Sequence, residues 1–212
     1  NCMVSPDNIN APPRTRKSKL SESEMRLRRV LKSAPQDLWL DTLRRTQCPS
    51  HDSLIYWMLN QTECDFAIAV HAFYHSNPAQ FLDTPRPLPL RPGPSDIFAL
   101  VLLNWDTGSY RTHRLQVDPI DADPRTIARI NQKVMAHPNG SLPFKIHERF
   151  LDPVGGSVMK VPPHLLPDES PHLWSIYHDL GLDVDAAPPG IARKIARAKS
   201  LFDMIKQGGR RA

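Results

Sequence analysis

The chain has 212 residues, of which 40% are hydrophobic and 23% are charged, so it can build a packed core and is not disordered throughout. Its formal net charge is +5, and three cysteines without close spacing exclude a disulfide framework. The longest apolar run covers residues 97–103, far short of the roughly 20 residues that span a bilayer, so no membrane span is predicted. Twenty-two prolines predict short helices joined by stiff connections.

Residues 1–19 are polar and contain Pro12-Pro13, which predicts a disordered tail without a signal peptide. The expected location is therefore the cytoplasm. Helical signals begin at residue 20, and we expect a single helical domain over residues 20–212.

The first helices are predicted from caps and apolar spacing. Ser21 and Glu24 form a capping box ahead of an apolar stripe that reaches Ala34. Pro35 ends this helix and can begin the next one, to about Thr46. Three more helices are expected: one over residues 54–60, one opened by the capping signature of Thr62 and Asp65 and ended by Asn77-Pro78, and a short one over residues 78–82.

Residues 85–94 are half proline and predict an extended connector, which could divide the chain into lobes of residues 20–84 and 95–207. The segment after it has two interpretations. A helix from Ser95 to about Trp105 is favoured, because the run is rich in Leu and Ala. The alternative is a β-hairpin that turns at residues 106–108.

In the second half, Asp123-Pro124 begins a helix that ends before Asn139-Gly140. Residues 141–168 are expected to be irregular, with short strands over residues 144–146 and 158–161. Helices are then expected over residues 170–180 and from Pro189 onwards. The predicted fold class is all-α: an irregular bundle of seven or eight helices with proline-rich connectors and a possible short β-hairpin.

The segment from residue 54 to residue 78 carries a recognisable set of side chains: Trp57, Leu59, Cys64, Asp65, Ala69, Phe73 and Tyr74. Over roughly residues 35–80 the chain resembles a bacterial helical family known as domain of unknown function 4274. The resemblance implies a bacterial protein with a helical domain. It implies no activity, because the family has none assigned.

Two histidines on one predicted helix are the best candidates for chemistry. His71 and His75 are four residues apart, so their rings can share one face, and Cys64 lies seven residues before the first. These side chains could bind zinc or iron, although the metalloprotease pattern H-E-x-x-H is absent. Otherwise the two histidines are polar residues on the solvent side of the helix. No cofactor and no catalytic residue is predicted.

The last predicted helix combines an apolar seam of period 3.5 with basic side chains, which predicts a partner-binding surface. The residues of this surface are Ile191, Arg193, Lys194, Ile195, Arg197, Phe202 and Ile205. The function favoured by the sequence is a non-catalytic protein-binding module. The alternatives are a metal-dependent enzyme that uses His71 and His75, and a nucleic-acid-associated protein that uses the basic last helix.

Overall fold

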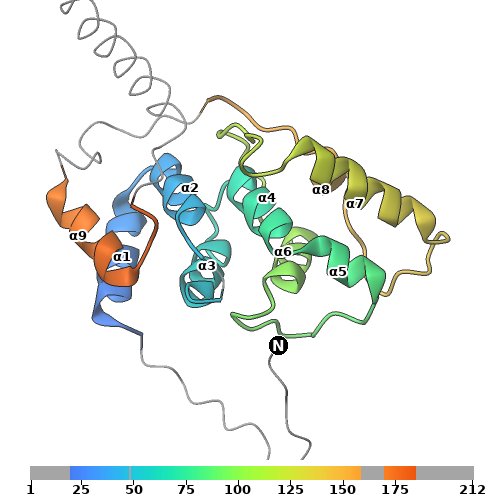
Figure 1. Cartoon of the computed structure of the whole chain (residues 1–212), viewed down its shortest axis with the longest axis horizontal. Helices are drawn as coiled ribbons and strands as arrows, with labels where there is room; N and C mark the ends of the chain where they lie inside the picture. The colour runs from blue at the N-terminus through green and yellow to red at the C-terminus, as the bar shows by residue number, and fades with distance from the viewer. Residues whose placement is uncertain (1–19, 48, 159–169, 185–212) are drawn as a thin grey trace, which may run out of the picture.

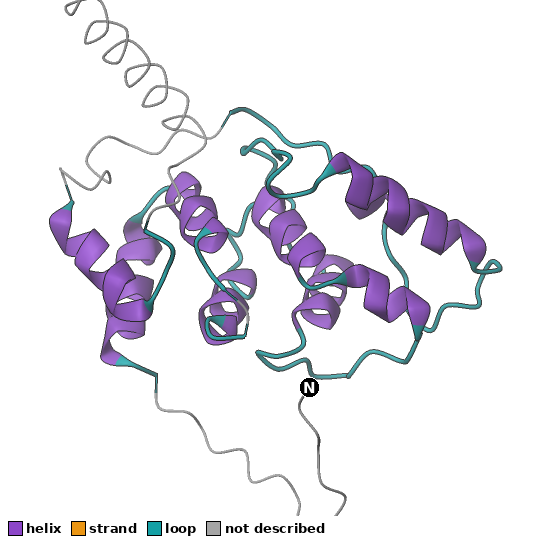
Figure 2. Ribbon diagram, viewed as in Figure 1, coloured by secondary structure: helices purple, strands orange, loops and turns teal. Residues whose placement is uncertain are grey.

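The computed structural model describes residues 20–47, 49–158 and 170–184, and these residues form nine helices and no sheet (Figure 2). The helices are α1 (Glu22–Ser33), α2 (Gln36–Arg44), α3 (Asp52–Leu59), α4 (Phe66–His75), α5 (Pro78–Asp83), α6 (Ile97–Asp106), α7 (Pro124–Ala136), α8 (Glu148–Leu151) and α9 (Pro171–Leu180). The predicted all-α class is confirmed. The predicted tail over residues 1–19 and the helix from Pro189 lie outside the described residues.

Local capping explains where several helices begin and end. Ser21 Oγ accepts a hydrogen bond from the Glu24 amide at 3.1 Å, and Asp123 Oδ2 accepts one from the Thr126 amide at 3.0 Å. Gly181 ends α9 with a φ of +67°, a left-handed conformation that favours glycine. These are short-range interactions, which is why the sequence placed these termini correctly.

α4 is the central helix of the molecule. Every residue from Phe66 to Tyr74 is buried, since α2 and α6 both pack against this helix. α1 pairs with α9 at one end of the molecule and α5 pairs with α7 at the other (Figure 1). Residues on both sides of the proline-rich segment 85–94 belong to one hydrophobic cluster, because α6 packs on α3 and α4.

The start of α4 is also held from a distance. Asp65 is fully buried and its Oδ1 caps the helix by accepting from the Ala67 amide at 3.0 Å. Its Oδ2 accepts from the Arg114 amide at 2.7 Å, and the Phe66 amide donates to the Thr112 carbonyl at 2.8 Å. The segment after α6 is thereby fixed against the N-terminus of α4.

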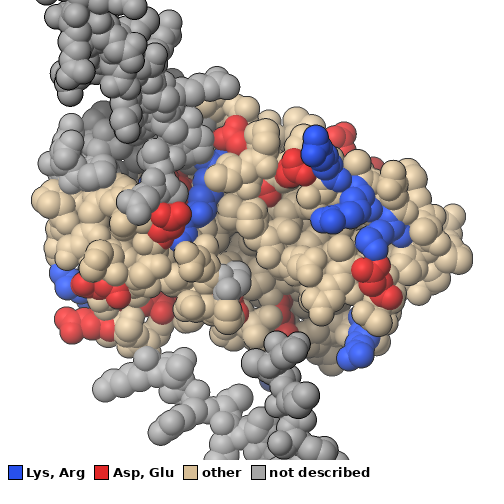
Figure 3. All heavy atoms as spheres, viewed as in Figure 1, with Lys and Arg blue, Asp and Glu red and all other residues tan. Residues whose placement is uncertain are grey.

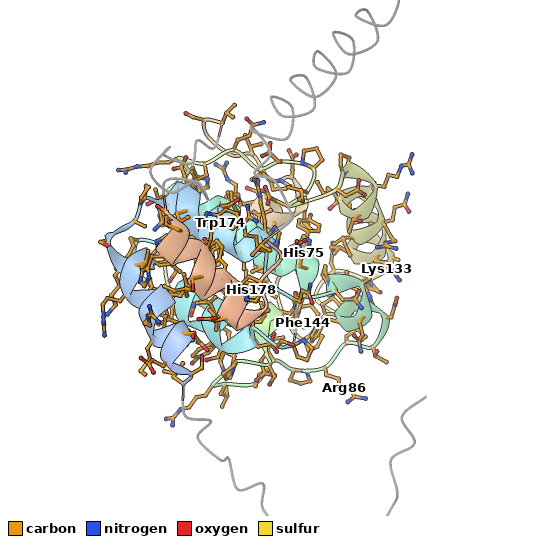
Figure 4. All side chains as sticks on the ribbon, turned by 60° about the vertical axis from the view of Figure 1, so that its left-hand side comes forward. His75, Arg86, Lys133, Phe144, Trp174 and His178 are labelled. Atoms are coloured by element: carbon orange, nitrogen blue, oxygen red, sulfur yellow. The ribbon has the colours of Figure 1, made fainter. Side chains whose placement is uncertain are left out.

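A buried arginine joins α2 to α9. The Arg45 guanidinium donates to Asp41 Oδ2 at 2.9 Å and to the Asp183 carbonyl at 2.8 Å. It also lies 4.7 Å from the ring centroid of Trp174, a cation–π contact. Trp174 lies on α9, the helix nearest the viewer in Figure 4.

Two sequence-based expectations are corrected. Residues 97–106 form helix α6, so the alternative of a β-hairpin at residues 106–108 is wrong. No strand forms over residues 144–146; the short helix α8 follows instead, ending against the core through the buried Phe150. The strand expected over residues 158–161 falls mainly outside the described residues.

Among the described residues, no helix combines the length and the apolar character needed to cross a bilayer.

Candidate functional site

The candidate site is built around His71, in the middle of α4. Its side chain is buried, with 5% of the residue exposed, so the interpretation of His71 as a solvent-facing residue is wrong. The reason is that α4 has neighbours on several sides and therefore has no wide solvent face. His75, one turn later, is exposed at the end of α4 that leads into α5 (Figure 4).

His71 is held by an aspartate from a distant loop. Its Nδ1 lies 3.0 Å from Oδ1 of Asp121, which is fully buried. Arg44, on α2, binds the same carboxylate with two nitrogens: Nε at 2.8 Å from Oδ1 and Nη2 at 2.6 Å from Oδ2. The same Nη2 also donates to Asp118 Oδ2 at 2.9 Å. We call these four residues, Arg44, His71, Asp118 and Asp121, the His71 network.

The network determines the charge of Asp121. Burial by itself would raise the pKa of this carboxyl, but the hydrogen bonds and charges of Arg44 and His71 outweigh it and hold that pKa below its ordinary value. Asp121 is therefore a carboxylate. It also accepts a hydrogen bond from the Asp118 amide at 2.9 Å, which completes the turn that presents it.

The same contacts determine the tautomer of His71. Burial is the largest effect on its pKa and lowers it to about 4, and the hydrogen bond that His71 makes to Asp121 offsets only part of this shift. His71 is therefore neutral at pH 7 and donates through Nδ1–H to the carboxylate. The lone pair is left on Nε2, as in a histidine oriented for use as a base.

Nε2 of His71 keeps a small exposure to solvent, although the residue as a whole is buried. It has no hydrogen-bond partner among the described residues, and the only fully buried polar side-chain atom without a partner in that part of the chain is Oδ1 of Asn131. His71 lines a pocket of about 300 Å³ between α2, α3, α4 and the start of α6. The face drawn in Figure 3 is hollowed near its middle.

The walls of the pocket are formed by both apolar and polar side chains. The apolar lining residues are Leu43, Ile55, Ala72, Phe81, Ile97 and Phe98. The polar ones, besides His71, are Thr46, Asp52, His75, Ser76, Asn77 and Ser95. This mixture is typical of sites for small organic molecules, in which a few polar groups orient a largely apolar ligand.

The structure brings together two of the three predicted metal ligands. His71 and His75 do lie together, with ring centroids 3.9 Å apart and planes 10° apart. A metal ion lies close to the plane of each imidazole that binds it, and two stacked parallel planes cannot both contain one ion. Cys64 is buried and its Sγ lies 3.8 Å from the Asp65 carbonyl oxygen; in the described part of the chain, no three His, Cys, Asp or Glu side chains group as a metal site requires.

Arg44 and Asp121 were not anticipated from the sequence as site residues. They lie 77 residues apart, and Asp121 lies 50 residues from His71. No local spacing connects them; a signal would have needed pairwise covariation. The predicted partner-binding residues, from Ile191 to Ile205, lie outside the described residues.

A basic stripe on α7 was also missed by the sequence interpretation. Arg125, Arg129 and Lys133 recur every four residues, and the first two are exposed. Lys133 forms an ion pair with Asp83. Three cations are fewer than the roughly 6–10 phosphate contacts of a typical duplex-binding protein, so this stripe alone does not favour nucleic-acid binding.

No protein-family model matches the chain, and no curated protein or solved structure matches it either. The resemblance to domain of unknown function 4274 over residues 35–80 stays a prediction.

Proposed function

We propose that this chain is an enzyme that acts on a small molecule in the pocket, with His71 as the general base. The observation that carries the proposal is the pair formed by His71 and Asp121 at the pocket wall. Nδ1 is bound to a carboxylate at 3.0 Å, and the unprotonated Nε2 is reached by solvent. A neutral imidazole in this arrangement can take a proton from water or from a hydroxyl group.

Each member of the network has a distinct role in this proposal. Asp121 is a positioning residue: it selects the tautomer of His71 and stabilises the imidazolium that forms when Nε2 takes a proton. Arg44 keeps Asp121 ionised. Because the pKa of His71 is about 4, the base is in its active form throughout the neutral range, with no loss of activity near pH 6.

Hydrolysis of p-nitrophenyl acetate, a small and unselective acyl ester, tests the proposal. We expect saturable hydrolysis that falls by about 10²-fold in His71→Gln, the usual contribution of a general base. The rate should be level from about pH 5.5 to 7.5. The matched control is His178→Gln, which removes an exposed histidine from α9 and should leave the rate unchanged (Figure 4).

Equal rates in the parent protein and His71→Gln would contradict the proposal. A rate that rises through pH 6.5 would also contradict it, because an ordinary histidine would then be responsible. Asp121→Asn, which keeps the shape of the side chain, should lower the rate without abolishing saturation.

Two of the sequence-based hypotheses remain as separate predictions. The protein-binding surface of the last helix would be detected by loss of a co-purifying partner when residues 189–212 are removed. A zinc or iron site would be detected by metal content that is lost in a His71→Ala/His75→Ala double variant.

A further inference from the structure

The charged side chains that line the pocket are of one sign only. Of the residues that line it, Asp52 is the only one with a formal charge at pH 7 when histidine is neutral, and no Lys or Arg lines it. His71 is neutral, because its pKa is about 4. The nearest cation of the network, Arg44, is bound to Asp118 and Asp121 and is neutralised by these two carboxylates. The only formal charge on the pocket lining is therefore negative.

Asp52 is placed to receive a ligand. It is the first residue of α3, where the free amides of the first turn stabilise its negative charge. The residue is half-buried, and none of the described residues donates a hydrogen bond to its carboxylate or pairs with it. A carboxylate that is partly withdrawn from water gains most from a cationic hydrogen-bond donor.

The rest of the lining specifies the body of such a ligand. Phe81 and Phe98 stack with centroids 4.2 Å apart and planes 12° apart, and both line the pocket together with Ile55 and Ile97. These walls favour an apolar group. The volume of about 300 Å³ is at the lower end of the range typical of small-molecule sites.

We propose that the pocket binds a small organic ammonium ion, a primary amine on an apolar body, with its ammonium group at Asp52. This inference names the substrate class of the proposed enzyme and so builds on that proposal. The amine donates to the Asp52 carboxylate, and the apolar body lies against Phe81 and Phe98. The neutral His71 then faces the ligand without repelling its charge.

Binding of benzylamine, benzyl alcohol and benzoate tests the inference, because the three share a ring and differ in charge. Calorimetry at low salt should show benzylamine bound at least tenfold more tightly than benzyl alcohol, and benzoate not bound. In Asp52→Asn the preference for the amine over the alcohol should disappear. Asp179→Asn, which removes an exposed carboxylate from α9, should keep it.

Several outcomes would overturn the inference. Equal affinity for amine and alcohol, tighter binding of benzoate, no measurable benzylamine binding, or an amine preference retained in Asp52→Asn would each do so. Far-ultraviolet circular dichroism checks that Asp52→Asn is folded.

The outcome of this experiment is separable from that of the proposed function. His71→Gln should lose ester hydrolysis and keep the amine preference. If hydrolysis depends on His71 but no amine preference exists, only the present inference fails. If the amine preference exists but hydrolysis does not depend on His71, only the proposed general base fails.

Discussion

At the scale of single residues, two aspartates that begin helices have different surroundings. Asp65 and Asp123 both cap a helix by accepting from a backbone amide at 3.0 Å. Asp123 is exposed and caps only its own helix. Asp65 is fully buried and also accepts from the amides of Arg114 and Leu115, at 2.7 and 3.4 Å. A comparison of Asp65 with Asp123 therefore distinguishes the effect of local capping from that of hydrogen bonds to a distant segment.

Asp65→Ala should lower the free energy of unfolding by about 3 kcal/mol, because it leaves several buried amides without an acceptor. Asp123→Ala should cost only about 1 kcal/mol, the usual cost of a lost N-cap. Urea unfolding followed by circular dichroism measures both. Equal costs for the two variants would show that the contacts to residues 114 and 115 contribute little.

At the scale of elements, a pair of glycines lets two loops approach closely. The Gly156 amide donates to the Leu115 carbonyl at 2.7 Å, and the Ser157 amide donates to the Arg114 carbonyl at 2.8 Å. A Cβ atom at Gly156 would lie 2.3 Å from the His113 carbonyl oxygen, and one at Gly155 would lie 2.4 Å from the Val117 amide nitrogen. The absence of side chains at Gly155 and Gly156 therefore allows this loop to pack directly against the backbone of residues 113–117.

Gly156→Ala should destabilise the protein by about 3 kcal/mol, since the obstructing atoms belong to the backbone and cannot rotate away. Gly93→Ala is the matched control. A Cβ there would meet only the Asp96 carboxylate, at 3.6 Å, so the change should be near zero or slightly stabilising. The midpoint of thermal unfolding distinguishes the two. If the two variants unfold at the same temperature, the loops do not pack as closely as described.

At the scale of the whole molecule, the His71 network links stability to pH. The unfolded chain binds a proton at His71 near pH 6.5, but the folded protein binds it only near pH 4. Between these values the unfolded state carries more protons, so the free energy of unfolding falls as the pH falls. The lowered pKa of Asp121 continues this loss at lower pH, whereas the raised pKa values of Asp41 and Asp65 act in the opposite direction.

The contribution of His71 to this loss should be about 3 kcal/mol between pH 7 and pH 4. His71→Gln should therefore have a smaller slope of unfolding free energy against pH than the parent protein. His178→Gln should keep the parent slope, because that histidine is exposed. Urea unfolding at several pH values gives the slopes. Equal slopes of unfolding free energy against pH for all three proteins would mean that His71 titrates as an ordinary histidine.

Local sequence signals are enough to predict the helical character of the chain and most helix starts. The N-caps Ser21 and Asp123 and the C-cap Gly181 of α9 depend only on residues close by in the chain. Residues 97–106 were correctly predicted as helix, because leucine and alanine favour it over a hairpin. The sequence also brought His71 and His75 together, since four residues make about one helical turn.

Which of these histidines is buried, and what it binds, depends on tertiary packing. α4 is apolar on most sides, so its periodicity does not reveal that His71 faces α2 and the loop of Asp121. The link from Arg44 through Asp121 to His71 depends on the packing of α2 against α4 and on the path of the chain after α6. These contacts join residues up to 77 positions apart, and no local rule of spacing or capping relates them.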